Sequence, residues 1–250
     1  MTWLLDLDGV VWLAEDPIAG SAEAIARLRG ELGQRVVFLT NNSSATLDEY
    51  LVKLERCGVP TEADDLITSA QAAATLVEPG ETALVCAGPG VEEALQARGV
   101  TTVREGAADA VVVGWHRDFD FDRLTAAFDA VHGGARLIGT NDDATYPTPQ
   151  GPLPGGGSIL AAVAYASGAE PVVAGKPFAP IVELLRQRVD DPELMVGDRP
   201  STDGRFAEAV GIPFGLVLSG VTSPEASPLV PPPARVARDL AAMVVQAYGG

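Results

Sequence analysis

Cysteine is scarce in this chain of 250 residues, which contains only Cys57 and Cys86. Two cysteines cannot build a disulfide framework, and neither belongs to a CxxC pair of the kind that binds metals or performs redox chemistry. We therefore expect two reduced thiols in a cytoplasmic protein. The two histidines, His116 and His132, have no partners at metal-ligand spacing, so a histidine-based metal site is not expected.

The sequence also lacks a long apolar run. No uncharged apolar stretch reaches the roughly 18 residues that a membrane span requires. The N-terminal segment has no basic region and meets a carboxylate already at Asp6, so we expect no signal peptide. These absences predict a protein that has no membrane as its partner.

Basic residues are few: 17 Lys and Arg stand against 34 Asp and Glu, which gives a formal net charge of −17. This excess of negative charge argues against nucleic acid or an anionic membrane surface as the main partner. It does not argue against a small phosphorylated ligand. Apolar residues make up 47% of the chain and charged residues 20%, a balance with ample material for a folded core.

Lysine is the rarest of the basic residues, because Lys53 and Lys176 are the only two in the sequence. A chain so poor in lysine does not scatter lysines for solubility, so each one invites a question about its role. Lys53 lies in an expected helix beside Glu55 and Arg56, and we expect it at the surface. Lys176 is taken up below.

Short apolar runs alternate with amphipathic stretches along most of the chain, the pattern of strands and helices in a parallel sheet covered by helices. The apolar runs predict strands at 3–7, 36–40, 84–87, 110–114, 136–139, 194–197 and 214–218. Helical periodicity and terminal glycines predict helices at 21–32, 47–57, 91–98, 121–132, 158–167, 180–188, 202–210 and 235–247. The segment 146–157 interrupts this alternation with turns rich in proline and glycine.

These patterns predict an α/β fold with a Rossmann-like core, a parallel sheet flanked by helices, and a second α/β unit inserted into its middle. We expect the core to comprise residues 1–70 and 175–250, and the inserted unit to comprise residues 71–174.

The first candidate site is Asp6-Leu7-Asp8-Gly9, at the end of the first expected strand. Ligands of open α/β sheets bind outside the carboxyl ends of the strands, so both carboxylates would flank that crevice. Two acids spaced in this way can divide labour, because one can attack as a nucleophile or hold a cation while the other transfers protons. The alternative is a pair of acids in a solvated turn.

Two further motifs offer phosphate ligands. The segment Thr40-Asn41-Asn42-Ser43 follows the second expected strand, and its hydroxyl, amide and backbone N–H groups suit a phosphoryl oxygen. Ordinary capping of the next helix explains it equally well. Lys176, in Gly175-Lys176-Pro177, can hold a phosphate or neutralise a carboxylate, although the spacing is not that of a Walker motif.

The fourth motif places Asp198 and Asp203 in the segment 197–203, after another expected strand. A carboxylate at a further strand end makes an oxygen-rich site for Mg²⁺ plausible, with waters or a substrate phosphate completing the octahedron. Asp203 would support that site from behind the ligands, unless it is only an acid favoured by the N-terminus of a helix.

Together and in this order, the four motifs resemble those of the haloacid dehalogenase superfamily. The motif sequences DLDGV, TNNSS, GKP and GDRPSTD are similar to those of its subfamily IIA, the NagD-like and p-nitrophenylphosphatase-like phosphatases. The segments 110–114, 139–141 and 155–158 also match that branch. The resemblance implies that residues 71–174 form an α/β cap domain over the core.

For the core, the resemblance implies a Mg²⁺-dependent phosphatase that forms an aspartyl-phosphate. Asp6 would be the nucleophile, and Asp8 would protonate the leaving alcohol and then activate water. Mg²⁺ would be held by the carboxylates of Asp6 and Asp198 and by the main-chain carbonyl of Asp8. The remaining core residues are expected to bind the phosphoryl oxygens (Thr40, Asn41 and Lys176) or to support the site from behind (Asn42 and Asp203).

For the cap, we expect His116, Asn141 and Asp142 to contribute to the choice of substrate. Members of this branch usually carry an acidic residue where this chain has Trp115-His116, and that departure concerns the substrate rather than the reaction. The expected partner is a small phosphorylated metabolite, and the resemblance also suggests a homodimer formed through the cap.

Several functions stay open on the sequence alone. A polyol or glycerol phosphate, or a p-nitrophenyl phosphate-like ester, is our first choice of substrate, and a nucleotide or sugar phosphate is the second. A non-catalytic phosphometabolite-binding protein is the alternative of another class, but Asp6, Asp8, Lys176 and Asp198 are all intact. A phosphotransferase or a dehalogenase on the same scaffold is the third, and a dehalogenase would need no Mg²⁺.

Overall fold

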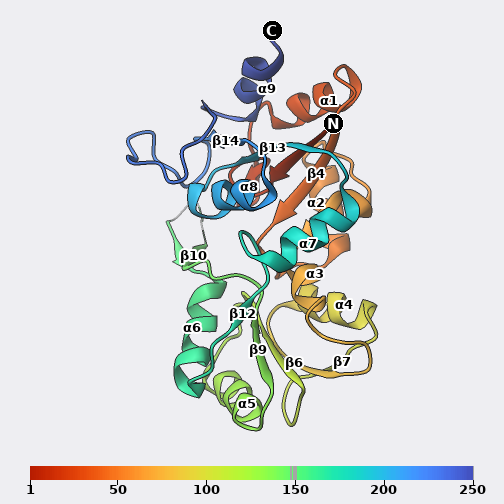
Figure 1. Cartoon of the computed structure of the whole chain (residues 1–250), viewed down its shortest axis with the longest axis vertical. Coiled ribbons are helices and arrows are strands. Elements are labelled where there is room, and N and C mark those ends of the chain that lie inside the picture. The colour runs from red at the N-terminus through yellow and green to blue at the C-terminus, as the bar shows by residue number, and fades with distance from the viewer. Residues whose placement is uncertain (147, 149–150, 250) are drawn as a thin grey trace.

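The computed structural model describes residues 1–146, 148 and 151–249. Its main element is a six-stranded sheet in which all neighbouring strands are parallel, in the order β15-β14-β13-β1-β4-β5 (Figure 1). The strands of this sheet are β1 (Thr2–Asp6), β4 (Arg35–Thr40), β5 (Leu66–Thr68), β13 (Pro192–Gly197), β14 (Phe214–Val217) and β15 (Arg235–Ala237).

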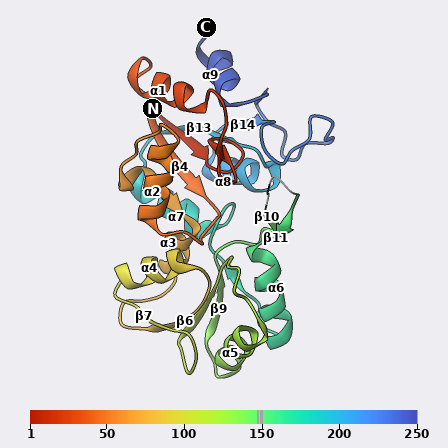
Figure 2. The ribbon, with the colours of Figure 1, turned by 180° about the vertical axis from the view of Figure 1, so that it is seen from behind.

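Alternation along β1 explains why helices cover both faces of this sheet. Trp3 and Leu5 point into one apolar cluster, and Leu4 between them points into another. The first face is covered by α1 (Ser21–Gly30), α2 (Leu47–Arg56) and α9 (Leu240–Tyr248), and the second by α3 (Ser69–Ala74), α7 (Ala179–Arg188) and α8 (Arg205–Val210). Figures 1 and 2, seen from opposite sides, show these two layers in turn.

A second parallel sheet lies beside the first, in the order β12-β9-β8-β6-β7. Its α4 packs into the cluster shared with the first sheet, while α5 and α6 form a separate cluster on the other face. Its elements are β6 (Thr82–Cys86), α4 (Pro89–Ala97), β7 (Thr101–Val103), β8 (Ala110–Val113), α5 (Phe121–His132), β9 (Arg136–Gly139), α6 (Gly156–Ser167) and β12 (Val172–Val173).

The expected α/β class with parallel sheets and flanking helices is confirmed. All strands of the second sheet lie between residues 82 and 173, within the segment that the sequence predicts as an insert. The division of the chain at residues 70 and 175, and the function of the insert as a cap, stay predictions.

Several elements differ from the sequence-based prediction. The predicted helix 235–247 is wrong in its first turn: β15 takes residues 235–237, and Asp239 starts α9 by accepting a hydrogen bond from the Ala242 N–H at 2.8 Å. The predicted helix 202–210 divides into a π-helical turn (Pro200–Gly204) and α8. Sequence patterns also missed η1 (Ala63–Asp65), β5, α3, β7, β12 and two short hairpins, β2 (Trp12–Leu13) with β3 (Asp16–Pro17) and β10 (Thr145–Tyr146) with β11 (Leu153–Pro154).

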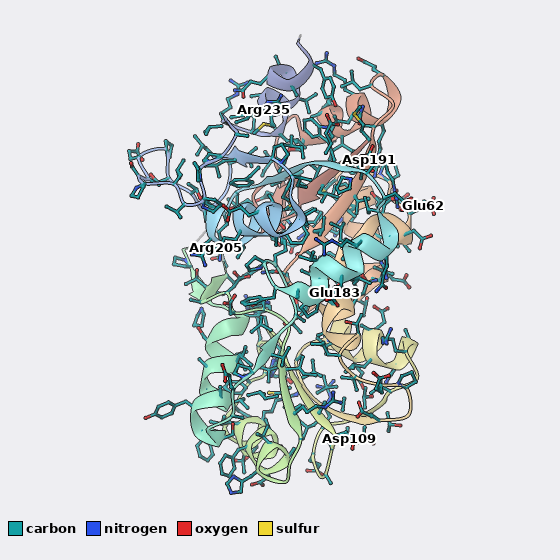
Figure 3. All side chains as sticks on the ribbon, viewed as in Figure 1. Glu62, Asp109, Glu183, Asp191, Arg205 and Arg235 are labelled. Carbon is teal, nitrogen blue, oxygen red and sulfur yellow. The ribbon has the colours of Figure 1, made fainter. Side chains whose placement is uncertain are left out.

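The acidic surplus lies mainly on the outside of the molecule. Glu62, Asp109 and Glu183, which Figure 3 labels, are examples of acidic side chains that are exposed. In the part of the chain that the structure describes, no helix is long and apolar enough to cross a bilayer.

Two valines test the assignment of the core. Val37 in β4 is fully buried, whereas Val52 in α2 is 56% exposed. We expect Val37→Ala to lower the free energy of unfolding by about 2 kcal/mol, because buried methyl groups are lost and a cavity remains. The matched substitution Val52→Ala should change it by less than about 0.5 kcal/mol. Urea unfolding measures both values, and equal effects of the two substitutions would contradict the assignment.

Candidate active site

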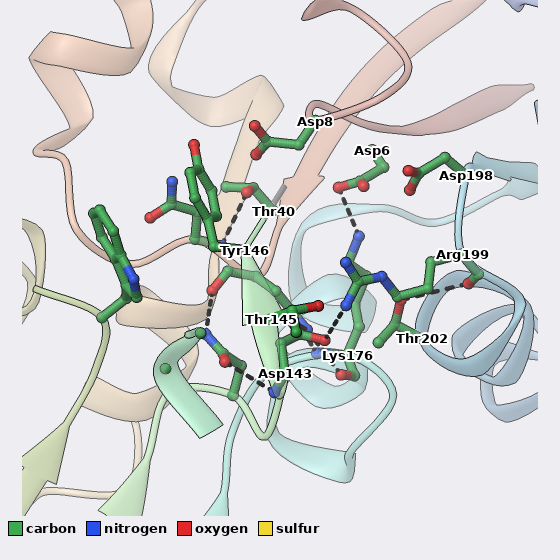
Figure 4. Close-up of a pocket in the computed structure, with 16 residues that line it drawn as sticks. Asp6, Asp8, Thr40, Asp143, Thr145, Tyr146, Lys176, Asp198, Arg199 and Thr202 are labelled. Carbon is green, nitrogen blue, oxygen red and sulfur yellow. Dashed lines mark hydrogen bonds and ion pairs between the residues drawn. The ribbon is translucent and has the colours of Figure 1, made fainter. Parts of the chain in front are cut away.

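Three neighbouring strands of the six-stranded sheet end at the same place. Asp6 is the last residue of β1, Thr40 is the last residue of β4, and Asp198 directly follows β13. Because β13, β1 and β4 are adjacent and parallel, their carboxyl ends bring these side chains together. They line a pocket, which Figure 4 shows with Asp8, Asp6 and Asp198 along one side.

Close backbone approach makes room for the carboxylates. Gly9 has a φ of +82°, and a Cβ atom there would lie 2.5 Å from Asp198 Oδ2. At Gly197, a Cβ atom would lie 2.2 Å from the Asp203 carboxylate. The glycines of the first and fourth motifs therefore allow the acids of the fourth motif to pack against the ends of β1 and β13.

Lys176 is the buried cation of the site, with only 1% of its surface exposed. Its Nζ donates to Asp6 Oδ1 at 2.8 Å, to Asp203 Oδ1 at 2.6 Å and to the Leu39 carbonyl at 3.2 Å. Asp203 is itself fully buried, and its second oxygen accepts from the Arg199 backbone N–H at 3.1 Å. Lys176 thus pairs with Asp6, the candidate nucleophile at the end of β1, and with Asp203, in the turn that follows β13.

These charges strongly perturb one another. Burial raises the pKa of Asp6 well above its usual range, Lys176 opposes this rise, and the nearby Asp203 and Asp198 add to it. Burial disfavours the charged form of Lys176, but Asp203 and Asp6 outweigh it and raise the pKa of this lysine. Burial, with Asp203 second, raises the pKa of Asp198 to about 7. The site holds more negative charge than Lys176 balances.

That surplus fits a divalent cation. One carboxylate oxygen each from Asp6, Asp198 and Asp203 lie within 4.8 Å of one another. Both oxygens of Asp203 are engaged by Lys176 and by the Arg199 backbone, so Asp203 suits the supporting position that the sequence predicts for it. Asp198 Oδ2 accepts from the Val221 N–H at 2.7 Å, which fixes the carboxylate beside Asp6. A hard cation bound by carboxylate oxygens of Asp6 and Asp198 is compatible with this arrangement.

The second motif forms another part of the pocket wall. The Thr40 hydroxyl lines the pocket and accepts from the Asn42 N–H at 3.1 Å. The Asn41 side chain is paired with the backbone of Lys176, accepting from its N–H at 2.8 Å and donating to its carbonyl at 3.1 Å. The Asn42 carbonyl accepts from the Tyr50 hydroxyl at 2.7 Å. Hydrogen bonds to the Lys176 backbone and to Tyr50 of α2 therefore fix the loop after β4.

Asp8 also lines the pocket, beside Asp6. Its Oδ1 accepts a hydrogen bond from the indole N–H of Trp12 at 3.2 Å. Burial raises the pKa of Asp8, while the charge of Lys53 and the Trp12 hydrogen bond act against this rise. The structure thus brings predicted residues of all four motifs into one pocket, with Asp203 buried behind its lining, whereas their individual roles stay predictions.

The inserted unit contributes a different set of residues from the one expected. Of the three candidates, only Asn141 lines the pocket, and its amide donates to the Asn41 carbonyl at 2.7 Å. His116 is not among the lining residues: it is 7% exposed, and its Nδ1 lies 2.9 Å from the Gly114 carbonyl. Burial lowers its pKa. Asp142 is exposed and likewise is not a lining residue.

Residues next to these candidates reach the pocket instead. Trp115 and Tyr146 line it with their rings 5.0 Å apart, centroid to centroid. Asp143 forms an ion pair with Arg199 at 3.2 Å and accepts from Asn41 at 3.0 Å (Figure 4). Sequence reasoning missed Tyr146, Asp143 and Arg199, and at Trp115-His116 it chose the histidine rather than the tryptophan. Proximity in the sequence was the available signal, since Arg199 lies inside the fourth motif and Asp143 follows Asp142.

Comparison with known proteins identifies what this chain is similar to. A family model described as Haloacid dehalogenase-like hydrolase matches residues 3–101, and one described as HAD-hydrolase-like matches residues 173–243. A D-glycerol 3-phosphate phosphatase of Mycobacterium tuberculosis is 37% identical over 227 residues, which cover 88% of this chain but only 63% of that longer protein. An acid sugar phosphatase of Staphylococcus saprophyticus is 34% identical over 229 residues, covering 89% of this chain and 88% of that protein.

The same likeness holds for structure. The crystal structure of a glycerol phosphate phosphatase from Mycobacterium tuberculosis in complex with magnesium superposes with a TM-score of 0.87 at 35% identity. The superposition covers 97% of this chain and 75% of that one. The resemblance seen in the four motifs therefore extends over nearly the whole chain.

Removal of the buried cation tests the electrostatics of the site. We expect Lys176→Met to lower the free energy of unfolding by about 3–5 kcal/mol near neutral pH, because Asp6 and Asp203 lose their partner. The loss should be smaller at about pH 5 than at about pH 7.5, because a buried carboxyl of raised pKa is stable when protonated and becomes costly as pH rises.

The control is Arg98→Met, which removes one positive charge from an exposed position of the same acidic chain. It should have little effect at either pH. Urea unfolding of both variants at the two pH values gives the answer. A Lys176→Met loss that is equal at both pH values, or larger at about pH 5, would contradict the electrostatic account.

Proposed function

Because the chain belongs to the haloacid dehalogenase-like hydrolases, we propose that it hydrolyses small phosphomonoesters through an aspartyl-phosphate on Asp6, with Mg²⁺ as cofactor. Curated relatives are named as phosphatases, one further relative is named as a 5'-nucleotidase, and the chain is an enzyme of the phosphatase type. The observation that carries the proposal is the ion pair between Asp6 and buried Lys176, beside Asp198, at the carboxyl ends of the parallel strands.

In the proposed first step, a carboxylate oxygen of Asp6 attacks the phosphorus atom, and the bond from phosphorus to the leaving oxygen breaks. Asp8 donates a proton to that leaving oxygen, so that the product is an alcohol rather than an alkoxide. Lys176 favours the anionic form of Asp6 that attacks, because its charge opposes the effect of burial on the pKa of Asp6.

In the second step, Asp8 takes a proton from a water molecule as that water attacks the phosphorus of the aspartyl-phosphate. The bond from phosphorus to Asp6 breaks, inorganic phosphate is released, and the Asp6 carboxylate is regenerated. Thr40, the Asn41 N–H and Lys176 would hold the phosphoryl oxygens throughout, since positioning is most of phosphoryl-transfer catalysis. Mg²⁺, held by Asp6, Asp198 and the Asp8 carbonyl, would neutralise phosphate charge when bound.

The pocket supports a small, hydroxyl-bearing leaving group. Its wall on the side of the inserted unit combines Asn141, Thr145 and the Asp143–Arg199 pair with the aromatic rings of Trp115 and Tyr146. Hydroxyl groups would find hydrogen-bond partners there, which favours polyol or glycerol phosphate. A relative named as a D-glycerol 3-phosphate phosphatase supports the same choice. Sugar phosphates are the second candidate, supported by relatives named as acid sugar phosphatases.

We further propose that residues 71–174 act as a cap over this site. The hydrogen bond from Asn141 to the Asn41 carbonyl and the contacts of Asp143 with Asn41 and Arg199 support this role, because they join the two units at the pocket. Association of two chains through this cap stays a prediction.

Turnover of p-nitrophenyl phosphate tests the proposed reaction. We expect phosphate release in the presence of Mg²⁺, its loss on addition of EDTA and its recovery with excess Mg²⁺. Asp6→Asn should lower kcat by a factor of at least about 10³, because the amide is not a nucleophile. The matched control Asp64→Asn changes an exposed acid in the same half of the chain and should keep full activity. Activity that survives EDTA or Asp6→Asn would overturn the mechanism.

A panel of phosphomonoesters tests the substrate class. Glycerol and other polyol phosphates should give the highest kcat/KM, ahead of sugar phosphates and nucleoside monophosphates, because the pocket is small and polar. A clear preference for nucleotides would contradict the assignment of the leaving group while leaving the reaction itself in place.

A further inference from the structure

The segment after the first motif folds back over Asp8 as a short hairpin. β2 (Trp12–Leu13) pairs antiparallel with β3 (Asp16–Pro17), and the Gly9 N–H donates to the Trp12 carbonyl at 2.7 Å. Trp12 is 1% exposed despite lying in this two-stranded hairpin. Its burial places the indole against Asp8 rather than at the surface of the molecule.

In the hydrogen bond between Trp12 and Asp8, the donor and the acceptor are fixed by the chemistry of the indole. The indole N–H can donate a hydrogen bond but cannot accept one, and it donates to Asp8 Oδ1 at 3.2 Å. An oxygen that accepts this bond is a poor place for a proton. The proton that Asp8 delivers to a leaving group, and later receives from water, therefore belongs on its other oxygen, Oδ2. Asp8 and Asp6 line the same pocket, and in Figure 4 the Asp8 carboxylate extends into it on the side of Thr40 and Tyr146.

The ammonium group of Lys53 lies over the Trp12 ring. Its Nζ lies 4.5 Å from the centre of the Trp12 ring and donates to the Ala14 carbonyl at 2.6 Å. Ala14 has a φ of +53°, the only positive value among non-glycine residues of the described chain, and it forms the turn of the hairpin. The Lys53 side chain is 21% exposed. Lys53 is therefore only partly exposed at the surface position that the sequence predicts, and its ammonium group is engaged by the hairpin.

The same helix secures both loops at this side of the pocket. Tyr50 and Lys53 are one turn apart on α2, and they bind the carbonyls of Asn42 and Ala14, respectively. The helix thus fixes the hairpin against the loop that follows β4. Lys53 and Lys176, the only lysines in the chain, both support acids of the first motif.

We infer that Trp12 is a positioning residue that holds the Asp8 carboxylate in orientation for proton transfer, and that Lys53 keeps Trp12 in place. This inference rests on the proposed function, in which Asp8 is the general acid and base. It assigns a role to two residues outside the four motifs, and it predicts that their effect depends on how much the leaving group needs a proton.

Leaving groups differ in that need. An alkoxide is a strong base and must be protonated as it leaves, whereas p-nitrophenolate is a stable anion near neutral pH. Loss of a well-positioned acid therefore slows attack on an alkyl phosphate more than attack on p-nitrophenyl phosphate. The quantity kcat/KM reports the steps up to the first irreversible one, so it isolates the transfer to Asp6 from the later hydrolysis.

The experiment compares kcat/KM for glycerol phosphate and p-nitrophenyl phosphate in the full-length chain with Mg²⁺. Trp12→Phe keeps the aromatic ring but removes the N–H, and it should lower the glycerol phosphate value by about tenfold or more and the p-nitrophenyl phosphate value by less than about threefold. Inhibition by inorganic phosphate should be unchanged within about twofold, because the phosphate ligands are untouched.

Lys53 supplies a second pair of variants that leave the buried indole in place. Lys53→Met removes the cation and the donor but keeps the aliphatic stem, and it should shift the ratio of the two kcat/KM values in the same direction. Lys53→Arg keeps a cation and donor at the ring and should restore the ratio. Arg56→Met, at an exposed position in the last turn of the same helix, is the matched control and should leave the ratio unchanged.

Two results would overturn the inference. Equal losses for both esters would mean that Trp12 and Lys53 serve only the fold, and unchanged ratios would mean that Asp8 needs neither of them. Thermal unfolding of each variant identifies any that does not fold, and the Lys53 variants then decide. The wild type separately tests the proposed function: if it hydrolyses neither ester, both the function and this inference fail, whereas a normal wild type with unshifted variants refutes the inference alone.

Discussion

The ion cluster formed by Lys176 with Asp6 and Asp203 is the interaction on which the site depends. A lysine with 1% exposure is costly to bury unless its charge is matched, and here two carboxylates and a main-chain carbonyl match it. The ends of β1 and β13 and the segment that returns from the inserted unit must meet for this cluster to form. The arrangement of the candidate site and the packing of the fold therefore both require this ion cluster.

The rest of the pocket is arranged around that cluster by loops rather than by regular elements. The Asn41 side chain binds the backbone of Lys176, and Asn141 and Asp143 from the inserted unit bind Asn41 in turn. On the other side, α2 holds the hairpin that carries Trp12. The net charge of −17 counts every residue of the chain, and most of its acids lie at the surface. Inside the pocket, the acids are instead gathered to suit a cation and a phosphate.

The sequence was sufficient for the elements and residues that follow a regular pattern. Strand ends after apolar runs located Asp6, Thr40 and Asp198, and the parallel order of the sheet then brought them together. It was insufficient where contacts are made across the fold. Tyr146 and Asp143 lie in a segment without periodicity, and the alanine-rich α3 shows no polar face. Lys53 has charged neighbours in sequence, but its side chain contacts the β2–β3 hairpin, which no sequence pattern predicted.

The most direct test of the central claim is to find where phosphate is attached during turnover. Enzyme mixed with substrate and Mg²⁺ is quenched with acid within the first turnover, digested, and analysed by peptide mass spectrometry. The account predicts one added phosphoryl group on the N-terminal peptide, at Asp6, and none in Asp6→Asn. A phosphoryl group on another residue, or its absence from an enzyme shown to accumulate its intermediate by a burst of released alcohol, would contradict the account.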